Sequence, residues 1–248
     1  MSNPTAPAHP VALVTGAARR IGAAIARRLH ADGYDVALHF HRSTSDAQAL
    51  AAELERTRAG SVLLLQADLA EFDRLPEMIA RIVGRFGRLD ALVNNASAFF
   101  PTPFGATTPS QWDALFAANV RAPFFLAQSA APHLRATGGA IVNLADIHGE
   151  RPLRAHAVYA MSKAALIQMT KALALELAPQ VRVNAVAPGA ILWPDSGKDE
   201  AAQSTLLART PLARIGRVEE IAEAVRWLLR DATYTTGQVI RIDGGRMM

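Results

Sequence analysis

Val11-Ala12-Leu13-Val14-Thr15-Gly16-Ala17-Ala18-Arg19-Arg20-Ile21-Gly22 is the stretch of sequence that decides the fold. A short apolar strand runs directly into a glycine turn, and a helical pattern follows. Gly16 permits a sharp turn from strand to helix, and Gly22 lets the helix pack closely on the sheet. The N-terminus of the helix offers free backbone N–H groups and a positive dipole end to a pyrophosphate. The segment therefore predicts the first βαβ unit of a dinucleotide-binding domain.

The same alternation of strand and helix continues to the end of the chain. Short runs rich in Val, Ile and Leu predict the strands Val11–Thr15, Asp35–Phe40, Val62–Gln66, Ala91–Asn94, Ala140–Leu144, Arg182–Val186 and Gln238–Ile242. Longer amphipathic or apolar stretches predict the helices Ile21–Ala31, Ser45–Thr57, Leu75–Phe86, Pro109–Leu134, His156–Leu177 and Val218–Leu229. Nearly continuous apolar strands are typical of a sheet that helices cover on both faces.

This order of elements predicts the fold class. Strands that alternate with helices imply right-handed crossovers and a parallel sheet. We expect an α/β fold: a single-domain, Rossmann-like, doubly wound parallel sheet of seven strands with helices on both faces. The domain should span residues 11–248, after a flexible N-terminal lead-in of residues 1–10. Residues 188–214, which hold three prolines and two glycines, are expected to form an irregular flap over a site.

Composition excludes several classes of protein. The chain has 248 residues, half of them apolar, and no cysteine, which rules out disulfides, thiolate catalysis and Cys-ligated metals. The net charge of +4 comes from scattered arginines and does not predict nucleic-acid binding. The histidines show no metal-ligand grouping. No apolar run approaches the roughly 18 residues of a membrane span, and residues 1–10 lack the pattern of a signal peptide. We expect a cytoplasmic protein that binds no membrane.

The turn after the second strand indicates which dinucleotide binds. An enzyme that uses NAD usually places an acid here to bind the ribose 2′-hydroxyl, but the chain has His41-Arg42-Ser43. A guanidinium with a neighbouring hydroxyl and imidazole suits a 2′-phosphate, through charge-assisted hydrogen bonds. We therefore predict NADPH as the cofactor. Asp68, after the third strand, is placed to meet the adenine or to act as a helix N-cap.

Arg20 stands where a TGxxxGxG turn has its middle glycine. An arginine fits there only if its side chain leaves the turn, and a guanidinium over a pyrophosphate or against a ligand oxygen suits that geometry. A surface arginine on the first helical turn is the alternative.

Tyr159 and Lys163 are candidate catalytic residues. They are four residues apart at the start of a long helical stretch, so both side chains point the same way. A nearby ammonium stabilises a phenolate, so we expect the tyrosine pKa to be lowered and the phenol to be a usable acid.

Taken together, the motifs of the whole chain resemble those of the short-chain dehydrogenase/reductase family. Besides the glycine turn and the Tyr/Lys pair, they include Asn94-Asn95-Ala96, Asn119 within a long helix, Pro188-Gly189 and Asp243-Gly244-Gly245. The resemblance implies that Asn119 holds a proton-relay water near Lys163. It also implies a set of cofactor contacts at Gly16, Arg20, Ile21, His41, Arg42, Ser43, Asp68, Leu69, Asn95, Ala96, Ser97, Tyr159, Lys163, Pro188 and Gly189.

Asp146 departs from the common family pattern. Thirteen residues before the tyrosine the family usually has a serine, whose hydroxyl polarises a carbonyl, and here the residue is aspartate. An ionised carboxylate cannot donate a hydrogen bond to a carbonyl oxygen and repels a developing alkoxide. It favours a nitrogen that gains a proton, so we expect the enzyme to reduce C=N rather than C=O.

Four features resemble the pteridine reductases within that family. They are Asp146, Arg20, the run His39-Phe40-His41-Arg42-Ser43, and Asn94-Asn95-Ala96-Ser97-Ala98-Phe99-Phe100-Pro101-Thr102-Pro103. The resemblance implies that Phe99 stacks on a pterin or folate substrate opposite the nicotinamide, while Ser97 and Arg20 contact cofactor phosphate and pterin. The expected mechanism puts Tyr159 on one side of the ring as proton donor and Asp146 on the other.

Several alternatives remain open from the sequence. Phe100 is better explained as a hydrophobe that anchors its loop, and Trp193 is either a substrate contact or a packing anchor. The chain is either a pteridine reductase, a carbonyl reductase such as a 3-oxoacyl thioester reductase, or a non-catalytic NADPH sensor. The helix over 156–177 is apolar on more than one face, which fits burial in one chain or in the homotetramer that the family resemblance implies.

Overall fold

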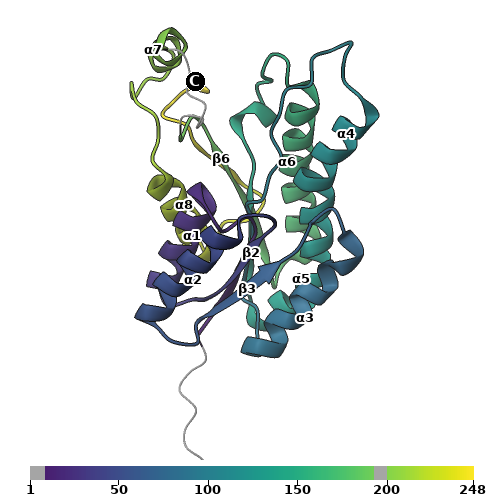
Figure 1. The fold of residues 1–248 in the computed structure, drawn as a ribbon, viewed down its shortest axis with the longest axis vertical. Coiled ribbons are helices and arrows are strands. Elements are labelled where there is room, and N and C mark those ends of the chain that lie inside the picture. The colour runs from purple at the N-terminus through teal and green to yellow at the C-terminus, as the bar shows by residue number, and fades with distance from the viewer. Residues whose placement is uncertain (1–8, 193–199) are drawn as a thin grey trace, which may run out of the picture.

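Seven short strands, most of them buried, form the centre of the protein. The computed structural model describes residues 9–192 and 200–248 and has one parallel sheet with the order β3-β2-β1-β4-β5-β6-β7 (Figure 1). The strands are β1 (Val11–Val14), β2 (Asp35–Phe40), β3 (Val62–Gln66), β4 (Ala91–Asn94), β5 (Ala140–Leu144), β6 (Arg182–Pro188) and β7 (Val239–Ile242). The predicted fold class is confirmed.

Helices cover both faces of this sheet (Figure 1). One layer packs through the core that contains Ile25, Leu50 and Val225, and the other through the core that contains Ile79, Leu126 and Leu177. The first layer comprises α1 (Arg20–Ala31), α2 (Thr44–Thr57) and α8 (Val218–Arg230). The second comprises α3 (Leu75–Phe86), α5 (Ala122–Thr137) and α6 (Ala157–Leu177), and α4 (Pro109–Phe116) packs on α6. The sheet residues alternate between the two cores, which is why the strands read as continuous apolar runs.

The strand order reverses beside β1, and this positions the site. β1 pairs with β2 on one side and with β4 on the other, so the loops that follow β1 and β4 lie at the carboxyl end of the sheet, where a crevice is expected at the reversal of strand order. Ligands of open α/β sheets bind at such a switch point. The glycine turn follows β1, the Asn95–Phe99 segment follows β4, and Asp146 follows β5.

The long helix predicted over Pro109–Leu134 is interrupted, which corrects that prediction. The structure has α4, then a π-helical turn η2 (Ala117–Arg121), then α5, which runs on to Thr137. Pro123 accounts for the break, because it has no N–H to donate to the carbonyl of Asn119 four residues earlier. π-helical turns inside helices are frequent at functional sites.

The segment predicted as an irregular flap also differs. β6 extends two residues further than expected, to Pro188, and a helix α7 (Glu200–Ala208) lies within the stretch. α7 stands apart from the two helical layers, near the C-terminal end of the chain (Figure 1). The predicted substrate contact Trp193 lies outside the described residues. Across residues 9–192 and 200–248, no helix combines the length and apolar character needed to cross a bilayer.

Candidate active site

The glycine turn between β1 and α1 leaves no room for side chains at two positions. Gly16 has φ +62°, and a Cβ there would lie 3.0 Å from the Cα of Ala96. A Cβ on Gly22 would overlap the carbonyl oxygen of Gly16. Backbone therefore approaches backbone on both sides of the turn, as a loop that cradles a pyrophosphate requires.

Thr15 and Asn95 brace this turn against the loop after β4. The Thr15 hydroxyl accepts hydrogen bonds from the N–H groups of Asn95 and Ala96, at 2.9 and 3.0 Å. In return, the Asn95 side-chain amide donates to the carbonyls of Thr15 and Gly16, at 2.8 and 3.1 Å. Two predicted cofactor residues, Asn95 and Ala96, thus serve here to fix the glycine turn.

Arg20 begins α1 in a left-handed conformation. Its φ is +53°, a value that costs a residue with a Cβ roughly 1–2 kcal/mol and glycine almost nothing. The residue is exposed at the N-terminus of the helix. Ile21, which follows it, is half-buried and packs against the core under α1.

The predicted 2′-phosphate site lies at the carboxyl end of β2. His41 and Arg42 are exposed, and within the described part of the chain the Arg42 guanidinium has no ion-pair partner. Ser43 precedes α2, but its hydroxyl does not cap that helix. A charged group and a hydroxyl are therefore both available to an anion at this point.

Asp68 and Leu69 lie beside it at the end of β3. Oδ1 of Asp68 accepts from the N–H of Ala70 at 2.9 Å, and Oδ2 is 3.7 Å from Nε2 of His41. Asp68 thus ends the strand with a tight turn and does not cap a helix directly, while Leu69 is buried. The structure brings the predicted adenine and 2′-phosphate residues together across neighbouring strand ends.

Tyr159 and Asp146 are in direct contact. The Tyr159 hydroxyl donates a 2.7 Å hydrogen bond to Oδ2 of Asp146, and Oδ1 of that carboxylate accepts from the N–H of His148 at 2.8 Å. The second bond lets Asp146 cap the short helix η3 (Ile147–Gly149). In this state the two side chains form one hydrogen-bonded pair, whereas the expected mechanism has them on opposite sides of the substrate ring.

Lys163 lies on the same helix face as Tyr159 and is 3% exposed. Its Nζ donates to the carbonyl of Leu144 at 2.8 Å and lies 5.8 Å from the centre of the Tyr159 ring. Burial lowers the pKa of Lys163 to about 8, although the charge of Asp146 acts in the opposite direction.

The expected lowering of the tyrosine pKa is wrong for this state of the protein. Burial raises the pKa of Tyr159, and the charge and hydrogen bond of Asp146 raise it further. The reason is that the phenol faces a carboxylate, while the ammonium of Lys163 is engaged with a backbone carbonyl. Tyr159 is therefore held in its protonated form.

Asn119, in the π-helical turn, holds the loop after β4. Its Oδ1 accepts from the Ser97 hydroxyl and the Ala98 N–H, at 3.0 and 2.8 Å. Its Nδ2 donates to the carbonyl of Ala98 and to the hydroxyl of Ser162, at 3.0 and 2.9 Å. All hydrogen-bonding positions of the Asn119 side chain are thus occupied. A relay water would have to bind the backbone carbonyl of Asn119, which lacks an α-helical donor because Pro123 has no N–H.

Phe99 projects from this loop beside Tyr159. Its side chain is 57% exposed, stacks on His156 at 4.8 Å and meets Tyr159 edge-on at 4.7 Å between ring centres. Phe100 instead is half-buried and packs against a small apolar cluster of Leu115, Val158 and Tyr159. The two neighbouring phenylalanines therefore have different surroundings, one open and one packed.

Pro188 and Gly189 end β6 on the other side of the crevice. The N–H of Gly189 bonds to the carbonyl of Ile242, and a Cβ on this glycine would lie 2.8 Å from the Cα of Asp243. This close approach explains why the Pro-Gly and Asp-Gly-Gly motifs occur together.

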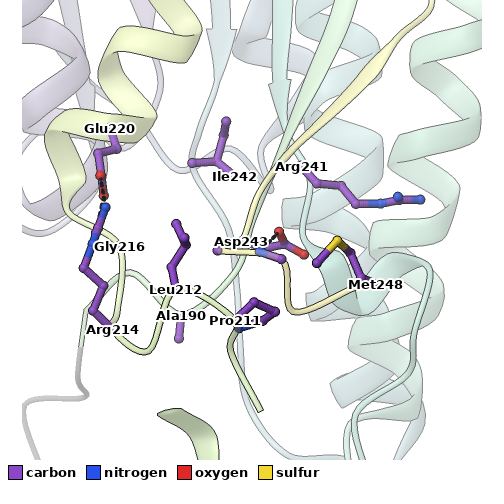
Figure 2. Close-up of a pocket in the computed structure, with 12 residues that line it drawn as sticks. Ala190, Pro211, Leu212, Arg214, Gly216, Glu220, Arg241, Ile242, Asp243 and Met248 are labelled. Carbon is purple, nitrogen blue, oxygen red and sulfur yellow. Dashed lines mark hydrogen bonds and ion pairs between the residues drawn. The ribbon is translucent and has the colours of Figure 1, made fainter. Parts of the chain in front are cut away.

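A cavity of about 460 Å³ lies beyond this point, between the segment that follows α7 and the C-terminal turn (Figure 2). Its charged groups are already paired: Arg214 with Glu220, and Arg241 with Glu150. Both carboxylate oxygens of Asp243 accept backbone N–H groups. None of the predicted catalytic side chains lines this cavity.

Sequence reasoning missed several residues of the site. Thr15 braces the glycine turn, Ser162 bonds Asn119, and His156 stacks on Phe99. His39 accepts a hydrogen bond from the turn itself. Thr15 and Ser162 are next to motif residues in the sequence, and this position was the signal that could have identified them. His156 gave no such signal, because only the folded chain brings it to Phe99.

The chain matches known proteins over nearly its whole length. Residues 16–246 match the family described as enoyl-(acyl carrier protein) reductase. Pteridine reductase 1 of Leishmania tarentolae is 38% identical, with 97% of each chain covered. A granaticin polyketide synthase putative ketoacyl reductase 2 of Streptomyces violaceoruber is 41% identical, also with 97% of each covered. The 3-oxoacyl-[acyl-carrier-protein] reductase FabG of Staphylococcus aureus is 39% identical, covering 96% of this chain and 98% of the relative.

Proposed function

The chain belongs to the short-chain dehydrogenase/reductase family of NAD(P)H oxidoreductases, and we propose that it is an NADPH-dependent pteridine reductase. Its substrate would be a dihydropterin or folate, whose C=N bond is reduced to the tetrahydro form. The observation that carries this proposal is the hydrogen-bonded pair of Asp146 and Tyr159 at the centre of the site.

A carboxyl group in this position suits a nitrogen better than a carbonyl oxygen. When C=N is reduced, the carbon gains a hydride and the nitrogen gains a proton. Because Asp146 faces the Tyr159 hydroxyl as a carboxylate, the proton would start on Tyr159, pass along the 2.7 Å hydrogen bond to Asp146 and go on to the nitrogen, directly or through water, leaving Tyr159 as the phenolate to be reprotonated. NADPH, when bound, supplies the hydride.

The geometry of the strand ends fits NADPH. The glycine turn has no room for a Cβ at Gly16 or Gly22, and the N-cap residue of α1 makes no side-chain cap hydrogen bond. Arg42 and Ser43 would hold the 2′-phosphate, since their side chains have no other partner in the described part of the chain. Asp68 and Leu69 would meet the adenine.

Phe99 supplies a flat surface for a heteroaromatic ring. The side chain is 57% exposed and its ring centre is 4.7 Å from that of Tyr159, so a pterin that stacked on it, opposite His156 or in its place, would have its edge near Tyr159 and Asp146. Lys163 and a water on the Asn119 carbonyl would return protons to Tyr159 from solvent.

A carbonyl reductase is the competing assignment, because ketoacyl and 3-oxoacyl reductases are as similar to this chain as the pteridine reductase is. The two assignments predict different substrates. The test is to follow NADPH oxidation by the purified protein with dihydrobiopterin, dihydrofolate and a 3-oxoacyl thioester, with NADH as control. Turnover of a pterin and little of the thioester supports the proposal, and turnover of the thioester alone contradicts it.

We also propose that the chain assembles into a homotetramer, as the family resemblance implies. Leu175 on α6 is 83% exposed in the single chain and Phe124 on α5 is 41% exposed, so core burial does not account for these apolar residues. Light scattering coupled to size exclusion measures the assembly directly.

A further inference from the structure

His39 is a buried histidine that the catalytic scheme does not use. It lies one residue before the end of β2 and is 2% exposed. Its Nδ1 is 3.1 Å from the N–H nitrogen of Gly16, and its Nε2 is 3.2 Å from the carbonyl oxygen of Ala67. Both ring nitrogens therefore have backbone partners, in the segments that follow β1 and β3.

These partners allow only one protonation state of the ring. The Gly16 N–H can only donate, so Nδ1 must be an unprotonated acceptor. The Ala67 carbonyl can only accept, so Nε2 must carry the hydrogen. Burial lowers the pKa of His39 to about 4, and the neutral form that both bonds require is thus the form present near pH 7.

The two partners belong to opposite ends of the dinucleotide site. Gly16 forms the turn that would cradle the pyrophosphate, and Ala67 immediately precedes Asp68 at the adenine end. The backbone of β2 adds to the connection, since Ala17 N–H bonds to the carbonyl of His39 at 2.8 Å. The first two N–H groups of the turn are thus directed to His39 and away from a ligand.

Because Gly16 is in the left-handed region, the turn depends on such contacts to hold one conformation. Asn95 binds the turn from the β4 side, and His39 binds it from the β2 side. Removing the imidazole would leave a buried N–H without a partner and free the turn on one side.

We propose that His39 is a positioning residue for the dinucleotide, which sets the glycine turn relative to the adenine loop without touching the ligand. The inference rests on the proposed binding of NADPH. It predicts an effect on cofactor affinity and little effect on the reaction once the cofactor is bound.

The test compares His39→Leu with His30→Leu as a matched control. His30 is also a buried histidine, bonded to Ser61 at 2.8 Å, at the far end of α1 from the turn. The dissociation constant of NADPH is measured by the change in its fluorescence, with kcat at saturating NADPH and the melting temperature alongside. We expect His39→Leu to raise the dissociation constant about tenfold or more and to leave kcat within about twofold. His30→Leu should lower the melting temperature alone.

Two further variants test the inference if His39→Leu does not fold. His39→Asn places an acceptor near the position of Nδ1 and retains the bond to Gly16, whereas His39→Gln can reach only the Ala67 side. We expect His39→Asn to bind NADPH more tightly than His39→Gln. Equal affinity of these two variants, or wild-type affinity in folded His39→Leu, overturns the inference. Wild-type protein that binds no NADPH would instead overturn the proposed function.

Discussion

The hydroxyl of Tyr159 donates a 2.7 Å hydrogen bond to the carboxylate of Asp146, thirteen residues earlier in the chain. The phenol is buried and faces a negative charge, and both conditions raise its pKa. The pair is therefore suited to keep a proton at the reacting centre near neutral pH, which is what reduction of a C=N bond requires.

Replacing Asp146 by serine should separate the two candidate activities. Asp146→Ser removes the group that would protonate a substrate nitrogen, and we expect kcat with a dihydropterin to fall roughly a hundredfold, as is typical for loss of an acid–base group. Serine is also a good N-cap, so the cap of η3 and the fold should survive. Turnover is measured at saturating NADPH, with a melting curve as the folding control. Unchanged pterin turnover would contradict the role of Asp146.

The charge of Asp146 should also set the alkaline limit of activity. In Asp146→Asn, burial still raises the pKa of Tyr159, but no carboxylate charge raises it further. The pKa of Lys163 falls further, because the charge of Asp146 no longer raises it. Both changes move the alkaline limb of the residual kcat/KM profile to lower pH. The profile is recorded from pH 6 to pH 10 for both proteins. A limb that stays in place means that another group controls it.

Phe99 and Phe100 allow a matched pair of variants. Phe99→Ala removes an exposed stacking surface, and we expect the KM for dihydropterin to rise about tenfold with little loss of stability. Phe100→Ala removes a half-buried side chain from the cluster of Leu115, Val158 and Tyr159, and we expect it to cost roughly 1–2 kcal/mol of unfolding free energy instead. Steady-state kinetics and urea unfolding of both variants give the comparison. The opposite pattern would exclude Phe99 as the stacking residue.

The sequence predicted the fold closely, because hydrophobic period and glycine position determine it. Buried strands such as Val11–Val14 and the turn at Gly16 can be recognised from their own residues, a run of apolar side chains and a glycine. The prediction of one unbroken helix over Pro109–Leu134 failed because the absence of an N–H at Pro123 changes the hydrogen-bond pattern without changing the apolar pattern. α7 was missed because the prolines and glycines around it outweighed its helix-forming residues.

The site was predicted less completely, since its geometry depends on contacts between distant segments. Spacing on one helix was enough to pair Tyr159 with Lys163. It was not enough to show that the phenol turns to Asp146 and that the ammonium turns to a carbonyl, which reverses the expected direction of the tyrosine pKa. His39 was named only as part of the run His39–Ser43, and its own role was not predicted, because its partners follow β1 and β3, which only the folded sheet brings together.

Arg42 should determine the choice of dinucleotide. Arg42→Ala removes the charge that would bind the 2′-phosphate, and charge-assisted hydrogen bonds of this kind are worth roughly 1.5–3 kcal/mol. We expect kcat/KM for NADPH to fall about ten- to a hundredfold and kcat/KM for NADH to change little. Arg56→Ala removes an equal charge from an exposed position near the far end of α2 and serves as the control. Equal losses with both cofactors would place the 2′-phosphate elsewhere.

His39 should make the folded state sensitive to mild acid. Burial lowers its pKa from 6.5 to about 4; the charge of His41 acts in the same direction, while the bond to Ala67 and the charge of Asp68 oppose it. Above pH 6.5 the histidine is neutral in both folded and unfolded chains and does not affect the pH dependence of stability. Between pH 6.5 and pH 4 the unfolded chain takes up a proton that the folded chain excludes, so stability falls as the pH falls. The loss reaches on the order of 3 kcal/mol near pH 4. Urea unfolding of wild type and His39→Asn at pH 7, 6 and 5 measures it. The variant should show a shallower decline, by about one proton, and parallel profiles would mean that His39 is not the group that titrates.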